Sequence, residues 1–266
     1  YEGDASFLQG PTERTKAVWN HCLKALEEER NNNGIRALDY TTVSTITSHP
    51  AGYIDKENEL IVGLQTDQVL KRAIKPFGGI NVVMKACREN GVEVDDRVKD
   101  IFTHYRKTHN DGVFDVYTEE IRSFRSLGFL TGLPDNYARG RIIGDYRRLA
   151  LYGLDRLIEA KKEDLHNLTG PMTEARIRLR EEVAEQIKAL KEIKVLGEYY
   201  GLDLSRPAYT AQEAVQWVYM AYLAAVKEQD GAAMSLGNVS SFLDIYLEYE
   251  LSQGTITETF AQIGRA

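Results

Sequence analysis

The residues best suited to chemistry lie in one short stretch that is rich in arginine and glycine. It runs from Thr131 to Arg148, reads TGLPDNYARGRIIGDYRR, and contains four arginines and three glycines. The guanidinium group is a planar fork of donors that fits a carboxylate through two parallel hydrogen bonds. Glycine lets the backbone approach a small ligand closely. The stretch therefore has the residue types that binding a small carboxylic acid requires.

The same stretch also permits a purely structural interpretation. If the chain is helical from Ala138 onward, Arg141, Asp145 and Arg148 fall at i, i+4 and i+7 on one face. Arg141 and Asp145 would then form an ordinary ion pair on the surface of a helix. The residues alone leave both interpretations open.

The cysteines and histidines show no spacing typical of a metal site. The only cysteines, Cys22 and Cys87, are far apart and fall at positions that we expect on helix faces. We predict that they pack as small buried hydrophobic residues, and not in a disulfide or a metal site. His104 and His109 are five residues apart, a spacing that does not put them on one helix face and argues against zinc.

Composition excludes some classes of function. The formal net charge is -7 and the sequence pI is near 5.4, which argues against binding to nucleic acid through the phosphate backbone. No run approaches the ~18 apolar residues that a membrane helix needs. The first residues lack the charged and apolar regions of a signal peptide, so the cytoplasm is the expected compartment.

The sequence pattern predicts a mostly helical chain. A helix is expected from Thr12 to about Arg30, closed by NNNG, because Asn and Gly tolerate the left-handed conformation that ends helices. Thr173 is expected to cap a long amphipathic helix that ends at Gly197. Its apolar face would carry Leu179, Val183, Ile187 and Leu190.

Three more helix starts are predicted toward the end of the chain. Thr210 and Glu213 form a capping box before AVQWVYMAYLAAV, which is apolar nearly all round and should be buried. Ser241 is expected to cap a helix that ends at Gly254, and Thr257 to cap a helix that runs for several turns. The segment FGGINVVM, 77–84, could be a strand or the start of a helix.

Several long and irregular segments resemble the pyruvate formate-lyase family (formate C-acetyltransferase), whose members are glycyl radical enzymes. The resemblance covers nearly the whole chain. It runs through STITSHPAGYIDKENELIVGLQTD (44–67), IFTHYRKTHNDGVFDVYT (101–118), the arginine-rich stretch, IRLREE (177–182) and NVSSFLDIYLE (238–248).

The resemblance implies an α/β fold that is predominantly helical. The family fold is a ten-stranded β/α barrel wrapped in helices, and this chain should hold the N-terminal part of that barrel with its surrounding helices. We expect residues 1–266 to form a single partial domain, the N-terminal portion of a larger enzyme. Residues 263–266, which read IGRA, depart from the family pattern.

The family's reaction converts pyruvate and coenzyme A to acetyl-CoA and formate during anaerobic glucose fermentation. A glycyl radical near the C-terminus produces a thiyl radical on one of two adjacent cysteines, and a separate iron-sulfur activating enzyme installs the glycyl radical. The resemblance also implies a homodimer for the full-length enzyme. Because neither the cysteine pair nor the radical glycine is matched here, the chain alone should be inactive and should bind no cofactor.

The resemblance assigns five residues to substrates. Arg141 matches the arginine that grips the carboxylate of pyruvate, and Ala232 matches a small residue that lines the pyruvate pocket. His49, Phe114 and Arg125 fall where the family contacts coenzyme A. The structural alternatives are a locally hydrogen-bonded loop histidine for His49, a core aromatic for Phe114 and a packing alanine for Ala232.

Two alternative functions remain open at this point. The chain could belong to a related enzyme that acts on 2-ketobutyrate, or on a polyol in a dehydratase; the segments TSHPAGYI and ARGRIIGDYRR favour the 2-keto acid branch. A truncated chain could instead bind or regulate a full-length partner without catalysing a reaction.

Overall fold

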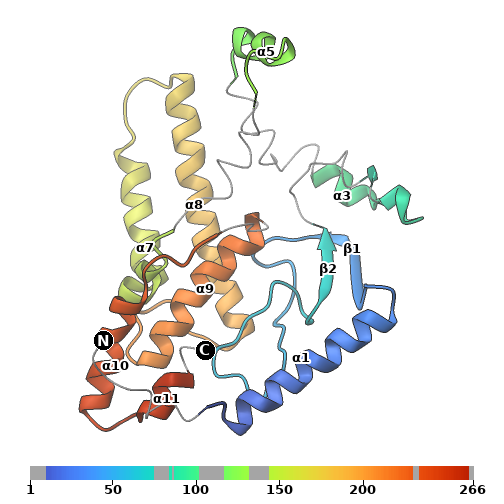
Figure 1. Cartoon of the computed structure of the whole chain (residues 1–266). Helices are drawn as coiled ribbons and strands as arrows, with labels where there is room; N and C mark the ends of the chain where they lie inside the picture. Colours follow the sequence, from blue (N-terminus) through green and yellow to red (C-terminus); the bar gives the residue numbers. More distant parts are fainter. Residues whose placement is uncertain are drawn as a thin grey trace.

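The computed structural model describes residues 10–74, 84–85, 87–101, 117–131, 144–229 and 234–263. These residues are mostly helical, with one small sheet, as the sequence predicted (Figure 1). The elements are α1 (Glu13–Asn31), β1 (Ala37–Val43), β2 (Lys71–Ile74), α3 (Asp96–Asp100), α5 (Glu119–Ser126), α7 (Arg147–Asn167), α8 (Glu174–Tyr199), α9 (Ala211–Gln229), α10 (Ser240–Ser252) and α11 (Glu258–Ile263).

Side-chain caps fix the starts of α1 and α8 where the sequence predicted them. The Thr12 hydroxyl accepts from the backbone N–H of Thr15, and the Thr173 hydroxyl accepts from that of Arg176, both at 3.3 Å. After α1, Asn33 and Gly34 have positive φ, as expected from NNNG. The predicted end of α8 at Gly197 was wrong. Gly197 is still helical, and the left-handed glycine that follows the helix is Gly201.

The capping box before α9 is confirmed in one half only. The Thr210 hydroxyl accepts from the N–H of Glu213 at 3.1 Å. The Glu213 carboxylate does not return to Thr210; it accepts from the N–H of Tyr209 and from Arg206, at 2.8 and 2.7 Å. The nearby guanidinium therefore draws the carboxylate one residue further back along the chain.

The cap predicted at Ser241 was wrong, whereas the cap at Thr257 is confirmed. Helix α10 begins at Ser240 after Val239, which offers no side-chain cap, and the Ser240 hydroxyl bonds the side chain of Asn238 instead. The Thr257 hydroxyl accepts from the N–H of Phe260 at 3.2 Å and opens α11. The segment 77–84 lies outside the described residues except for Met84, which is helical.

The main core lies where α9 packs against α7, α8 and α10. Trp217, Met220 and Leu223 of α9 are buried there, which confirms the prediction of a buried helix. On α8, Val183 and Ile187 are buried and Leu190 is partly buried, but Leu179 is 43% exposed. Figure 1 shows that the first turns of α8 lie beside α7 only, beyond the reach of α9.

Helix α7 is interrupted at Gly153, where φ is 70°. The interruption frees the N–H groups of Leu154 and Asp155, which donate to the carbonyls of Leu204 and Ser205 at 2.9 and 3.1 Å. The backbone of the loop before α9 therefore fits into the kink. A side chain at Gly153 would overlap the backbone of Ser205 and Arg206.

Helix α9 also holds an irregular segment, residues 44–68, through polar side chains. The Gln216 amide accepts from the N–H of Val62 and donates to the carbonyl of the same residue, both at 2.8 Å. The Tyr219 hydroxyl donates to the Gly63 carbonyl at 2.9 Å. These bonds take the place of secondary structure for the backbone around Val62.

Strands β1 and β2 flank the irregular segment and pair in parallel. Ala37 lies opposite Lys71 and Asp39 opposite Ala73, with a register shift between Asp39 and Val43. A small cluster of Val43 and Val98 covers the sheet, with Cys87 packed against it. Cys22 and Cys87 are free thiols and only half-buried, so the prediction that both are buried was wrong in degree.

The kink in α7 leads to a prediction about two glycines with the same backbone conformation. Gly153→Ala should cost about 3 kcal/mol or more of unfolding free energy, because the new methyl group adds a backbone clash to left-handed strain. Gly201→Ala should cost only roughly 1 kcal/mol, because Gly201 also has a φ of 70° but no atom within 4 Å of the new methyl group. Urea unfolding of both variants measures the difference, and equal costs would contradict this account of the kink.

The bonds of α9 lead to a second prediction about two glutamines one turn apart. Gln216→Leu should cost about 2–4 kcal/mol, because it leaves both polar backbone groups of Val62 without their partner. Gln212→Leu should cost under about 1 kcal/mol, because Gln212 is exposed and donates only to the carbonyl of Leu60. Urea unfolding compares the two variants, and a costly Gln212→Leu with a neutral Gln216→Leu would refute the role of Gln216.

Candidate functional site

Two of the five predicted substrate residues, His49 and Arg125, fall in the described part of the chain. Arg141, Phe114 and Ala232 lie outside the described residues. His49 follows β1 in the loop of residues 44–50, whereas Arg125 belongs to α5. Figure 1 shows α5 well away from the two strands, so the structure does not bring Arg125 to His49.

The stretch that follows Arg141 is not one continuous helix. Helix α7 begins at Arg147, and residues 144–146 before it are not helical. Asp145 pairs with Arg147, whose Nε lies 2.7 Å from the carboxylate, and this hydrogen bond lowers the pKa of Asp145. The structural interpretation required one continuous helix from Ala138 to Arg148, and residues 144–146 contradict that condition.

Tyr222 of α9 contacts two described residues, Tyr146 and Met234, that lie close in the sequence to Arg141 and Ala232 respectively. Its ring packs edge-to-face on Tyr146, with centroids 5.5 Å apart. Its hydroxyl lies 3.5 Å from the carbonyl of Met234, to which it donates. Tyr146, directly before α7, and Met234, after α9, thus both contact the side chain of Tyr222.

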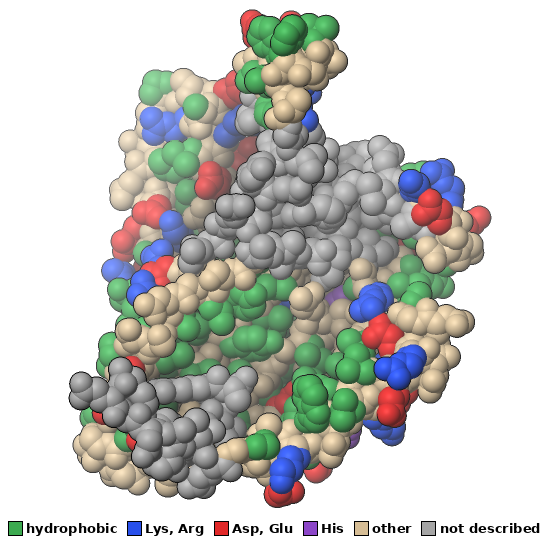
Figure 2. Space-filling view, in the orientation of Figure 1, with side chains coloured by type: hydrophobic (Ala, Val, Ile, Leu, Met, Phe, Trp, Pro, Cys, Tyr) green, Lys and Arg blue, Asp and Glu red, His purple; other side chains and the backbone are tan. Residues whose placement is uncertain are grey.

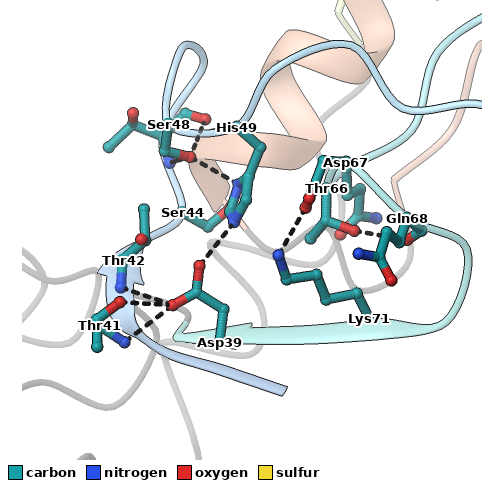
Figure 3. A network of polar contacts seen from close by, with 12 residues as sticks. Asp39, Thr41, Thr42, Ser44, Ser48, His49, Thr66, Asp67, Gln68 and Lys71 are labelled. Carbon is teal, nitrogen blue, oxygen red and sulfur yellow. Dashed lines mark hydrogen bonds and ion pairs between the residues drawn. The ribbon is translucent and has the colours of Figure 1, made fainter. Parts of the chain in front are cut away.

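His49 lies in a buried polar cluster that sequence reasoning did not predict (Figure 3). The imidazole is only 3% exposed. Its Nδ1 lies 3.0 Å from the Ser48 hydroxyl, and its Nε2 lies 3.5 Å from Oδ2 of Asp39. Nε2 has no hydrogen-bond partner, and its contact with Asp39 is an ion-pair distance only. The expected local hydrogen bond of His49 is confirmed at Nδ1.

Asp39 and Asp67 supply the negative charges of this cluster. Burial opposes ionisation of Asp39, but three hydrogen bonds from Thr41 and Thr42 outweigh it and lower the pKa of the carboxyl. Burial also opposes ionisation of Asp67, but the bond from Lys71 at 2.8 Å, a backbone hydrogen bond and the charge of Lys71 together outweigh it and lower the pKa. Both carboxylates are therefore charged at neutral pH.

Lys227 near the end of α9 is the buried cation of the cluster. Its side chain is 1% exposed, and Nζ donates to the carbonyl of Gln65 at 3.0 Å. Burial, followed by the charge of Lys227, lowers the pKa of His49. At neutral pH the imidazole is therefore neutral, and it lies among the carboxylates of Asp39 and Asp67 and the side chains of Lys71 and Lys227.

Arg125 is half-buried in α5. Its guanidinium lies 5.7 Å from the centre of the Tyr117 ring, a cation–π arrangement. The exposed face of this helix carries Phe124, which packs edge-to-face on Phe129.

A second site that sequence reasoning missed is an apolar groove between α1 and the layer of α9 and α10. Figure 2 shows apolar side chains gathered over α9 and along α1. The groove has a volume of about 890 Å³. Val18, Trp19 and Cys22 of α1 line one wall, and Val215 and Leu243 belong to the opposite wall. The helical spacing of Val18, Trp19 and Cys22 is the signal that could have indicated an apolar face.

The part of the chain that the structure describes holds neither a metal-binding cluster nor a membrane-spanning helix. No group of three or more His, Cys, Asp or Glu side chains gathers closely enough in this part of the chain to hold a metal ion. Among the helices that the structure describes, none has the length and apolar character needed to cross a membrane.

The sequence matches a known family and a curated relative. A family model described as pyruvate formate lyase-like matches residues 1–263. The formate acetyltransferase of Haemophilus influenzae is 55% identical over 267 aligned residues, which cover 98% of this chain and 35% of the relative. The chain thus spans about a third of the length of that protein.

Solved structures with a similar fold include three dehydratases at low sequence identity. A B12-independent glycerol dehydratase from Clostridium butyricum has a TM-score of 0.59 at 17% identity, with 96% of this chain and 39% of that one covered. A hydroxyproline dehydratase from Clostridioides difficile has a TM-score of 0.63 at 15% identity, with the same coverage. A protein of 1,2-propanediol dehydration from Roseburia inulinivorans has a TM-score of 0.54 at 16% identity, with 96% and 37% covered.

Because their sequence identity is low, these solved structures support only the fold. The family model, in contrast, matches residues 1–263, which is nearly all of the sequence. The chain belongs to the pyruvate formate lyase-like family.

Proposed function

We propose that this chain is part of a formate acetyltransferase that converts pyruvate and coenzyme A to acetyl-CoA and formate. The observation that carries the proposal is the 55% identity to a formate acetyltransferase over 98% of the chain. In this proposal the enzyme works in the cytoplasm during anaerobic glucose fermentation, as a homodimer that a separate radical-activating enzyme switches on.

The chain would contribute substrate binding and not bond-making. Its only cysteines, Cys22 and Cys87, are not adjacent, so the family's cysteine pair must come from outside these 266 residues. The family's glycyl radical supplies the unpaired electron for cleavage of the bond between the carboxylate carbon and the carbonyl carbon of pyruvate. Arg141 would hold the carboxylate through two hydrogen bonds and fix its geometry.

Arg141 and Ala232 would share the pyruvate site. The contacts of Tyr222 support this proposal, because they join Tyr146, five residues after Arg141 in the sequence, to Met234, two residues after Ala232. A small side chain at Ala232 would leave space for the keto group. We further propose that 1–266 is a single partial domain that forms the first part of the family's ten-stranded barrel.

Coenzyme A would be the second substrate, with His49, Phe114 and Arg125 as its contacts. Arg125 is half-buried and carries a charge that suits a phosphate. The His49 ring faces Ser48 and Asp39 and is almost fully buried, so contact with coenzyme A requires the loop of residues 44–50 to turn the ring outward.

The pyruvate assignment predicts a specific loss when Arg141 is replaced in a protein that carries the whole catalytic apparatus. Arg141→Lys keeps the charge but loses the planar fork. Charged hydrogen bonds are worth roughly 1.5–3 kcal/mol, so kcat/KM for pyruvate should fall on the order of ten- to hundredfold. Arg141→Ala should lose more, and the KM for coenzyme A should stay unchanged in Arg141→Lys. Formate release, measured anaerobically with pyruvate and 2-ketobutyrate side by side, gives both rates and the preferred 2-keto acid.

Arg148→Lys is the matched control, because Arg148 is exposed on the first turn of α7. It should cost well under one kcal/mol. If Arg148→Lys cripples pyruvate turnover while Arg141→Lys leaves it intact, the wrong arginine has been assigned.

The isolated chain should release no formate from pyruvate, even with the activating enzyme present. The reason is chemical, because the sequence offers neither an adjacent pair of thiols nor a matched radical glycine. An anaerobic assay with labelled pyruvate measures formate above background. Any turnover that depends on pyruvate would show that this chain has catalytic groups of its own.

A further inference from the structure

His49 is a buried titratable group on a loop that contacts two other parts of the chain, the end of α9 and strand β1. The Ser44 hydroxyl donates to the carbonyl of Lys227 at 3.4 Å, and the N–H of Ile46 donates to the Glu228 carboxylate at 3.3 Å. These bonds attach the loop to the end of α9. On its other side the His49 ring faces Asp39 of β1.

The hydroxyl of Ser48 can serve only one acceptor at a time. It lies 3.0 Å from the Thr45 carbonyl and 3.0 Å from His49 Nδ1, and it accepts from the N–H of Thr45 at 2.9 Å. With a neutral ring that carries its proton on Nε2, the hydroxyl donates to Nδ1. With a protonated ring, Nδ1 becomes a donor and the hydroxyl must turn to Thr45. One proton on His49 therefore reverses the bond between Ser48 and His49 and turns the Ser48 hydroxyl proton toward Thr45.

The surroundings of His49 do not accommodate a positive charge well. Asp39 on β1 and Asp67 before β2 attract the charge, whereas Lys71 on β2 and Lys227 on α9 repel it. Oδ1 of Asp39 is occupied by three donors, so the carboxylate is not free to swing toward a ring that lies 3.5 Å from its other oxygen. Burial removes the water that would otherwise stabilise an imidazolium, and the net effect lowers the pKa of His49.

We propose that the segment from Ser44 to Pro50 is an acid-sensitive latch, which a neutral His49 holds closed against β1 and α9 and which protonation of His49 opens. An opened loop exposes the imidazolium to water and relieves its repulsion with Lys227. The latch depends only on the described polar cluster and not on the reaction proposed above.

The sign of the pH dependence follows from the two protonation equilibria. The closed state holds a ring whose pKa is lowered, and the open state holds a ring with the ordinary value of 6.5. Between these two values the open state binds more protons, so acid favours opening. The closed state is fully stable above pH 6.5 and weakens as the pH falls below it, until the lowered pKa is reached. The opening equilibrium should change by up to about tenfold per pH unit in that window.

Hydrogen exchange of backbone amides in the full chain between pH 7.5 and 5.5 tests the latch. Protection factors, corrected for the intrinsic pH dependence of exchange, should fall for Thr45 and Ile46, whose N–H groups bond Ser48 and Glu228. The amide of Val62, which is bonded to Gln216, should keep its protection. A pH-independent protection of Thr45 and Ile46 overturns the proposal, as does an equal loss at Val62.

A pair of histidine variants separates His49 from other titrating groups. His49→Gln cannot take up a proton and should abolish the pH dependence at Thr45 and Ile46. His21→Gln, which removes an exposed histidine paired with Asp55, should leave it unchanged. A slope that survives in His49→Gln overturns the proposal.

If His49→Gln fails to fold, the wild-type chain still decides the question. Proton NMR of the five histidines gives the titration midpoint of each ring. The His49 midpoint and the change in protection should obey one linked equilibrium. A His49 ring that titrates with no change in protection at Thr45 and Ile46 rejects the latch.

Discussion

The structure depends on one helix that satisfies two different demands. Helix α9 packs apolar side chains such as Trp217 and Met220 into the core. From the same helix, Gln216 and Lys227 supply hydrogen bonds to a segment that has no regular structure of its own. Unpaired backbone groups are costly when buried, so the irregular segment can lie against the core only because these side chains replace the partners that a sheet would provide.

Close contact within that segment restricts the residues that it can carry. A side chain at Gly52 would overlap the carbonyl of Thr66, and one at Gly63 would crowd Leu223. The hydroxyl of Tyr200 then accepts from the N–H groups of both Gly52 and Leu64, at 3.0 and 3.1 Å. A helix tolerates many sequences with the same periodicity, but a segment of this kind needs particular residues at many positions. Resemblance there is therefore more informative than resemblance in a helix.

The features predicted correctly from the sequence are local ones. Thr12 and Thr173 cap helices because a hydroxyl needs only an amide three residues away. Ser241 does not cap α10 because the helix already begins at Ser240, one residue earlier. The burial of Gln216 and Lys227 depends on partners 154 and 162 residues distant, and no spacing in the sequence indicates such contacts. The polar cluster around His49 was missed for the same reason. The proposed pyruvate residues came from family resemblance alone.

The two proposed substrate regions are connected through the last turns of α9. Tyr222 contacts the described neighbours of Arg141 and Ala232, and Lys227 lies beside His49. Five residues separate these two side chains, which corresponds to a rise of about 7.5 Å along a helix. Because both residues belong to the same continuous helix, the regular backbone fixes the separation of their Cα atoms. In the proposed function, one regular helix therefore connects the neighbours of the pyruvate residues with the loop that carries His49.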